Sequence, residues 1–400
     1  MVSPFVMILV ALLLAYTISE VLKRTLGIPR VVGQVGAGLI LSIVFIKSFL
    51  FNQENTDVLS FLASLGVVLL FYYVGLETNF SVFRKNLTKS LTISLINTTL
   101  PLLAGFLVMK YVFDFTNMVS LIIGVALSVS AQSVSFGFLE ELNLVKSKLG
   151  STIISSGATD DIIELILISV LLSFFQLTVI DSPHLALALG LFFFVILVAV
   201  ARLWFIPMTL KFFDREKSST ARFTGALLIV LLIASLSELF GLGFLMGALI
   251  AGIVVRQTIF KEITLPDWEE HDIARSIHII SFGFLVPLFF VWVGLNTDIS
   301  TIGANLFFVA ILILIALLGS VGGSTLAVIL NKGTFREGMI IGWGLTPKGD
   351  IELALATLAL NAGIITPAIF TALVVMALFT TLISPMVFKY LVTSSKKKIL

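Results

Sequence analysis

Three acidic residues lie in a stretch of the chain that is otherwise apolar or small. Asp160, Asp161 and Glu164 fall within residues 149–175. At about 1.5 Å per residue, a helix over this stretch places Asp161 roughly 16 to 18 Å from its start, near the middle of a bilayer about 30 Å thick. A carboxylate at that depth is costly and typically faces a water-filled cavity or a partner. The stretch therefore predicts a functional site, with a structural ion pair as the alternative.

The chemistry that suits such acids is the binding of a monovalent cation and a proton in turn. Hard cations prefer oxygen ligands, and one carboxylate with hydroxyl and amide oxygens supplies them. The candidate ligands are Asp161, Asp160, Thr159, Ser130 and Gln132. Adjacent residues on a helix point about 100° apart, so Asp160 and Asp161 cannot both face one cavity equally, and we expect them to have different roles. Because one carboxylate cannot hold a cation and a proton together, this competition would couple their movements.

The composition is that of a multi-pass membrane protein. Hydrophobic residues make up 58% of the 400 residues and charged residues 12%, and the mean hydropathy is +1.13. We therefore predict a single membrane domain over residues 1–400, surrounded by lipid and without a soluble regulatory domain. The chain has no cysteine, which excludes disulfides and thiol chemistry. Without phosphate, nucleic-acid or metal-ligand motifs, we expect no enzyme activity, no cofactor and no nucleic-acid partner.

Apolar runs bounded by charged residues, glycine or proline predict about 13 transmembrane helices. They lie near 4–22, 27–50, 58–76, 88–112, 117–139, 149–176, 184–210, 221–239, 241–256, 276–295, 303–330, 337–361 and 366–391. Lysine and arginine concentrate in alternate loops and in the C-terminal tail, whereas the opposite loops contain only Lys47 and Lys110. This bias predicts an external N-terminus and a cytoplasmic C-terminus. The predicted fold class is an all-α polytopic protein of the cell membrane.

Three short motifs recur in the same order and at a nearly constant offset. Residues 33–40 match 247–254, residues 73–78 match 292–297, and residues 122–128 match 340–346. Each matched pair of predicted helices is an odd number of helices apart, so the two copies are expected to be inverted in the membrane. The first repeat covers about 27–180 and the second about 241–391. Inverted repeats are typical of secondary transporters whose binding site lies near the bilayer midplane.

The third pair of motifs runs into small and polar residues in the middle of two predicted helices. In the repeat alignment, residues 128–133 correspond to Thr346-Pro347-Lys348-Gly349-Asp350-Ile351 of the second copy. Proline removes a backbone donor and glycine relaxes the chain, so we predict two discontinuous helices that cross at these points.

Four charged residues are predicted to support the site. They are Lys348, Asp350, Glu164 and Glu352. Lys348 is placed to offset helix C-terminal ends and to pair with Asp160 or Glu164, because an unpaired ammonium at this depth is expensive. The alternative is that Lys348 only stabilises the crossing.

On these residues the chain resembles the monovalent cation:proton antiporter-2 family. The matches are residues 26–34, Val74-Gly75-Leu76-Glu77, Asp160-Asp161, Val293-Gly294-Leu295 and Pro347-Lys348-Gly349-Asp350. The resemblance implies a core domain with crossing broken helices, a separate dimerisation domain, a homodimer and alternating access. It also implies that Asp161 binds cation and proton in turn, in exchange of Na⁺ for H⁺. A K⁺/H⁺ antiporter or K⁺ efflux transporter of the same family is the alternative.

This chain departs from the family pattern at three positions. Ser320 stands where many relatives have a lysine, and Glu164 and Glu352 look like additions, which leaves the cation and the charge per cycle open.

Two other classes of membrane protein also place acidic residues in the membrane. An intramembrane aspartyl protease could use Asp161 and Asp350, but the sequence contexts typical of that class are absent. A passive channel usually has a symmetric pore, whereas the acid pair occurs in only one repeat.

Overall fold

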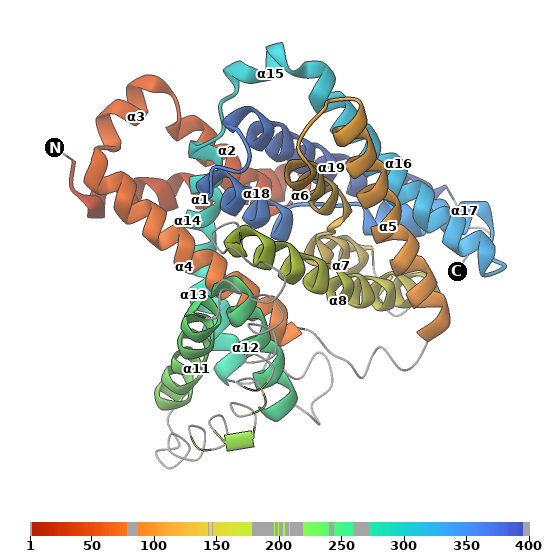
Figure 1. Cartoon of the computed structure of the whole chain (residues 1–400), viewed down its shortest axis with the longest axis horizontal. Helices are drawn as coiled ribbons and strands as arrows, with labels where there is room; N and C mark the ends of the chain where they lie inside the picture. The colour runs from red at the N-terminus through yellow and green to blue at the C-terminus, as the bar shows by residue number, and fades with distance from the viewer. Residues whose placement is uncertain are drawn as a thin grey trace. The chain divides into compact units, whose positions relative to one another are not determined.

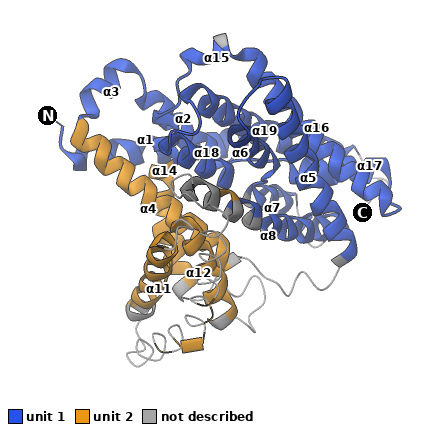
Figure 2. Cartoon of the chain, viewed as in Figure 1, with its two compact units in different colours: residues 1–52, 80–168, 290–400 blue, residues 53–79, 169–289 orange. Residues whose placement is uncertain are grey.

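The computed structural model describes residues 2–77, 87–142, 144–145, 147–177, 219–239, 244–259 and 272–394, with a few single residues between 196 and 208. Within this part of the chain every regular element is helical, which confirms the all-α prediction (Figure 1). The chain divides into two compact units (Figure 2). Unit 1 comprises Met1–Asn52, Phe80–Ile168 and Phe290–Leu400, and unit 2 comprises Gln53–Asn79 and Ser169–Phe289.

Unit 1 carries all the residues predicted to form the site. Its helices are α1 (Pro4–Leu26), α2 (Arg30–Leu41), α3 (Val44–Leu50), α5 (Leu87–Tyr111), α6 (Asn117–Ser128), α7 (Gln132–Glu141), most of α8 (Lys148–Leu177), α15 (Ser300–Ala304), α16 (Leu306–Leu330), α17 (Phe335–Leu345), α18 (Ile351–Asn361) and α19 (Pro367–Thr393). Helix α5 packs against α6 and α16, and α16 also packs against α17 and α19. These neighbours surround the two helix breaks.

Unit 2 is built around the contact of α12 with α4 and α11. Its elements are α4 (Gln53–Glu77), α11 (Ser219–Leu239), α12 (Phe244–Ile259), α13 (Asp272–Ile280), the π-helical turn η3 (Ser281–Leu285), the start of α14 (Val286–Leu295) and the end of α8. None of the predicted site residues belongs to this unit.

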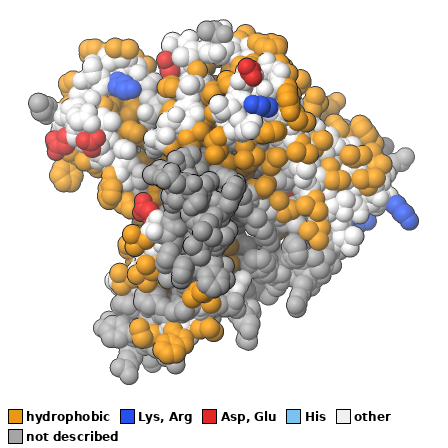
Figure 3. Space-filling model, viewed as in Figure 1, with side chains coloured by type: hydrophobic (Ala, Val, Ile, Leu, Met, Phe, Trp, Pro, Cys, Tyr) orange, Lys and Arg blue, Asp and Glu red, His pale blue; other side chains and the backbone are white. Residues whose placement is uncertain are grey.

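Much of the described surface is apolar, as expected for helices that face lipid. Large hydrophobic side chains are exposed on α1, α3, α5 and α16, and Figure 3 shows such side chains over much of the visible face, with few charges among them. Within the described residues, six helices are long and apolar enough to span a bilayer, or up to seven if a bent pair counts as one span. The chain is therefore a multi-span membrane protein, while the count of 13 and the orientation remain predictions.

The predicted second span differs from the structure. It is not one helix but two, α2 and α3, bent by 85° at the junction of residues 42–43. At this junction Ser42 Oγ donates to the carbonyl of Leu39 at 2.7 Å, and a serine that bonds the chain behind it competes with continuation of the helix. The predicted seventh span, near 184–210, lies almost wholly outside the described residues.

Both predicted helix breaks are confirmed at the expected positions. Helix α6 ends at Ser128 and α7 begins at Gln132, while α17 ends at Leu345 and α18 begins at Ile351. Between α6 and α7, Val129 is extended, with φ −64° and ψ 142°. Pro347 has no N–H to donate to the helix, which accounts for the interruption of the predicted span near 337–361 that contains it.

Two pairs of glycines bring helix backbones into direct contact, one pair in each unit. A Cβ on Gly38 would meet the carbonyl oxygen of Val291 and lie 2.8 Å from Gly294 Cα. A Cβ on Gly75 would likewise meet the carbonyl oxygen of Leu249 and lie 3.0 Å from Gly252 Cα. Only glycine permits such an approach, so α2 packs on α14 within unit 1, and α4 packs on α12 within unit 2.

Candidate functional site

The two helix breaks contact each other directly. The amide of Ala131 donates to the carbonyl of Pro347 at 2.7 Å, and the ammonium of Lys348 donates to the carbonyl of Val129 at 2.6 Å. On the other side, the hydroxyl of Thr381 in α19 donates to the carbonyl of Lys348. These bonds satisfy backbone groups that the interrupted helices leave without a partner, which a membrane interior requires.

Lys348 is fully buried at this crossing. Its bond to Val129 places a positive charge beside the C-terminal end of α6, where the helix dipole is negative. Three buried acids, Glu352, Glu164 and Asp160, are close enough to interact with its charge. Lys348 therefore shares its surroundings with acids of both α8 and α18.

Asp160 points to helix α5, where three neutral side chains bind it. Its Oδ1 accepts from Ser94 Oγ at 2.6 Å and from Thr98 Oγ1 at 3.1 Å. Its Oδ2 accepts from Asn97 Nδ2 at 3.1 Å. All four side chains are buried. Sequence analysis missed these three residues of α5, although polar residues at i, i+3 and i+4 in an apolar helix share one face and could have indicated a binding surface.

A different face of α8 points to the break between α6 and α7. The Oε1 atom of Glu164 accepts from the amide of Ser130 at 3.0 Å and from its hydroxyl at 3.1 Å. The amide group of Gln132 donates to the same hydroxyl at 2.9 Å. Gln132 also lies so close to Gly157 that a Cβ there would overlap its amide.

Asp161 belongs to this second face of α8. Gly157, Asp161 and Glu164 are at i, i+4 and i+7 and so lie along one side of the helix. Asp161 is partly exposed, whereas Asp160 and Glu164 are fully buried. Thr159 is buried and its hydroxyl donates to the carbonyl of Ser155 at 2.8 Å within α8. The structure thus brings Asp161, Ser130 and Gln132 to one region, with Thr159 at the side.

The acids of the second break lie at the start of α18. Asp350 is the residue before the helix, and Glu352 is in its first turn, where negative charge suits the helix dipole. Glu352 is 1% exposed, and neither of its carboxyl oxygens has a hydrogen-bond partner among the described residues. Ser320 is also buried, and within the described part of the chain its hydroxyl has no partner.

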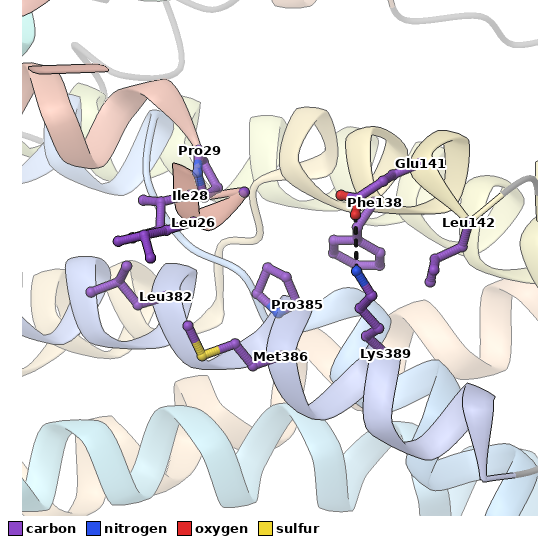
Figure 4. Close-up of a pocket in the computed structure, with 11 residues that line it drawn as sticks. Leu26, Ile28, Pro29, Phe138, Glu141, Leu142, Leu382, Pro385, Met386 and Lys389 are labelled. Carbon is purple, nitrogen blue, oxygen red and sulfur yellow. Dashed lines mark hydrogen bonds and ion pairs between the residues drawn. The ribbon is translucent and has the colours of Figure 1, made fainter. Parts of the chain in front are cut away.

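A small pocket elsewhere in unit 1 contains none of the predicted site residues (Figure 4). Leu26, Pro29, Phe138 and Leu382 contribute to its apolar wall. Glu141 and Lys389 also line it and form an exposed ion pair at 3.1 Å. Exposed pairs of this kind contribute little to stability, and the pocket lacks the buried polar groups found around Asp161.

Comparison with known proteins agrees with this architecture. A family model described as "Sodium/hydrogen exchanger, transmembrane" matches residues 8–393. The "Na(+)/H(+) antiporter" of Enterococcus hirae is 29% identical over 365 residues, covering 90% of this chain and 91% of that protein. The "Na(+)/H(+)-K(+) antiporter GerN" of Bacillus cereus is 28% identical over 361 residues, covering 90% and 89%.

The fold is also that of a solved structure. The sodium proton antiporter MjNhaP1 from Methanocaldococcus jannaschii superposes with a TM-score of 0.67 and 17% identity, over 99% of this chain and 98% of that chain. At this identity the likeness shows the fold alone. Because the family model covers nearly the whole sequence, the chain belongs to the sodium/hydrogen exchanger family, whose members are membrane transporters rather than enzymes.

Proposed function

We propose that this chain exchanges a monovalent cation for protons across the cell membrane, with Asp161 as the shared site. One observation carries the proposal most directly. The partly exposed Asp161 lies on the face of α8 that packs against the break between α6 and α7, next to polar side chains that the break supplies. Secondary transporters with interrupted helices bind their ions at such breaks.

The oxygen atoms near Asp161 suit a hard monovalent cation. The Asp161 carboxylate supplies the charge, Ser130 and Gln132 supply hydroxyl and amide oxygens, and water completes the shell. A proton on Asp161 would remove the negative charge that holds the cation, so each ion excludes the other. Movement of the loaded site between the two sides of the membrane then gives alternating access, with the cation and protons carried in opposite directions.

Na⁺ is the first candidate for the transported cation and K⁺ the second. The Enterococcus hirae relative is named a Na⁺/H⁺ antiporter, while the name of the GerN relative includes K⁺ as well. Antiport needs no further cofactor, because the cation, the proton and the carboxylate together account for the coupling.

We also propose that the chain is an inverted repeat, over about 27–180 and 241–391, with about 13 transmembrane helices and an external N-terminus. The paired glycines support this proposal. In the repeat alignment Gly38 corresponds to Gly252, and Gly294 corresponds to Gly75. The Gly38–Gly294 contact of unit 1 therefore has its equivalent in the Gly252–Gly75 contact of unit 2.

The test of the proposed function is exchange by the purified protein in liposomes with gradients of Na⁺, K⁺ and Li⁺. Asp161→Asn keeps the size of the side chain but removes the charge, so we expect a folded protein that exchanges no cation for protons. Glu141→Gln, in the exposed ion pair with Lys389, is the control and should leave exchange unchanged. Wild-type exchange by Asp161→Asn would disprove the assignment of Asp161.

A further inference from the structure

Within the described part of the chain, the hydrogen bonds to the carboxyl group of Asp160 all come from neutral side chains of one helix. Ser94, Asn97 and Thr98 donate three hydrogen bonds to its two oxygens. A carboxylate has about four lone-pair positions, so most of the acceptor capacity of Asp160 is already used. Its nearest cation, Lys348, donates instead to the carbonyl of Val129.

A second layer fixes the orientation of Asn97. The Asn97 side chain donates through Nδ2 to Asp160 and accepts through Oδ1 from Ser324 Oγ of α16 at 2.9 Å. An amide can be turned end for end at little cost unless both of its ends are bound. Ser324 therefore selects the orientation in which Asn97 presents a donor to Asp160.

We propose that Ser94, Asn97 and Thr98, with Ser324 behind Asn97, are positioning residues for cation exchange. This polar anchor holds Asp160 against α5, and because Asp160 and Asp161 are adjacent on α8, it fixes the direction in which Asp161 faces. Asp160 then acts as a bound anchor rather than as a ligand of the transported cation. The inference rests on the proposed function, because it concerns how Asp161 is aimed.

The geometry explains why an anchor at Asp160 controls a site at Asp161. The two side chains leave α8 about 100° apart, so a rotation of the helix that improves one contact worsens the other. The three hydrogen bonds from one face of α5 to Asp160 restrict rotation of α8 about its axis more than a single flexible ion pair would. A ligand that is misplaced by about 1 Å loses much of its binding energy, which makes the anchor a determinant of cation affinity.

The experiment compares anchor variants with a matched hydrogen bond between the same two helices. Ser90 is one turn before Ser94 on α5, and its hydroxyl lies 2.9 Å from that of Ser155 on α8, without contacting Asp160. Ser94→Ala and Thr98→Val each remove one bond to Asp160, whereas Ser90→Ala removes a comparable bond elsewhere. Thr98→Ser retains the hydroxyl and serves as the conservative variant.

We expect Ser94→Ala and Thr98→Val to raise the half-saturating cation concentration about three- to tenfold, which is about the net contribution of one ordinary hydrogen bond, with smaller changes in the maximal rate. Ser90→Ala and Thr98→Ser should stay within about twofold of the wild type. Equal effects of Ser90→Ala and Ser94→Ala would overturn the proposal, because the loss would then be general packing. An anchor variant with wild-type cation affinity and normal thermal stability would also overturn it.

A double-mutant cycle tests the second layer. If Ser324 acts through Asn97, Ser324→Ala should raise the half-saturating concentration in the wild type but have no further effect in Asn97→Ala. Independent, additive effects would contradict the orientation role of Ser324. These outcomes can be told apart from failure of the proposed function. The proposed function fails if Asp161→Asn still exchanges cation for protons, and that result does not depend on the cation affinities of the anchor variants.

Discussion

Lys348 carries the one positive charge that the described residues place among the buried acids at the crossing. Its charge is near Glu164 and Asp160 of α8 and Glu352 of α18, and its ammonium donates to the carbonyl of Val129. A buried charge that loses its partner is strongly destabilising, so the lysine and the acids depend on one another. At the scale of single residues, the site is therefore a group of charges in which each substitution affects several neighbours.

Lys348→Gln should lower the thermal unfolding temperature by several degrees. The substitution leaves the acids of α8 and α18 without a nearby positive charge and weakens the link between the two breaks, at a cost of about 3 kcal/mol or more. Thermal unfolding of the purified protein in detergent measures this, with Lys348→Arg as the control that keeps the charge.

Transport by the surviving Lys348→Gln protein separates the two roles of the lysine. Normal exchange with lower stability would show that Lys348 only holds the crossing together. A changed apparent cation affinity or charge per cycle would show that it takes part in coupling. If stability and transport were both the same as in the wild type, both roles would be contradicted.

The proposed competition at Asp161 predicts how exchange depends on pH. If a proton and a cation exclude each other there, lowering the pH should raise the half-saturating cation concentration and leave the maximal rate at saturating cation nearly unchanged. For one competing proton the limiting slope is about tenfold per pH unit on the acidic side. Initial rates over a grid of pH and cation concentration test this, and an affinity independent of pH would exclude a shared site.

The helices of each unit are held together by close backbone contacts as well as by apolar packing. Gly38 of α2 meets Gly294 of α14, and Gly75 of α4 meets Gly252 of α12. In lipid there is little hydrophobic force between helices, so small residues that allow close approach contribute much of their association. The glycine motifs of the sequence are thus helix contact surfaces.

Gly38→Ala should destabilise the protein by about 1 to 3 kcal/mol, because the new methyl group overlaps the backbone of α14. Gly36 is on the same helix, and a Cβ there would meet nothing within 4 Å, so Gly36→Ala is the matched control. Thermal unfolding of the two variants gives the comparison. Equal melting temperatures would show that α2 and α14 can separate without cost.

At the scale of the whole molecule, the charge distribution predicts the orientation in the membrane. The basic residues of alternate loops and of the C-terminal tail predict a cytoplasmic C-terminus and an external N-terminus. An odd number of spans is required for this arrangement. The resemblance to the cation:proton antiporter-2 family further predicts a homodimer.

Reporter fusions at the two ends of the chain test the orientation. We expect a cytoplasmic signal at the C-terminus and an external one at the N-terminus, because the translocation of positively charged loops is disfavoured. Two ends on the same side would rule out 13 spans and, with them, the inversion of the repeats. Light scattering of the purified protein would show whether it is a dimer.

The sequence by itself determined the all-helical class and the two breaks at the crossing, since these depend on local chemistry. Apolar runs predict the spans, and Pro347 with the polar residues around Ser130 predicts both breaks, which the structure confirms. The acids of α8 could also be recognised as a candidate site, because their depth in an apolar run follows from hydropathy alone. The bend between α2 and α3 was missed, because no proline marks it.

The tertiary structure decided which side chains meet across the fold. Ser94, Asn97 and Thr98 are more than sixty positions from Asp160, and Ser324 is 227 positions from Asn97, so no local pattern pairs them. The bond of Lys348 to Val129 likewise needed the two breaks to come together. Local propensity acts over a few residues along the chain, whereas the packing of α5, α8 and α16 brings distant residues to the same carboxylate, and the surroundings of Asp160 and Asp161 differ for that reason.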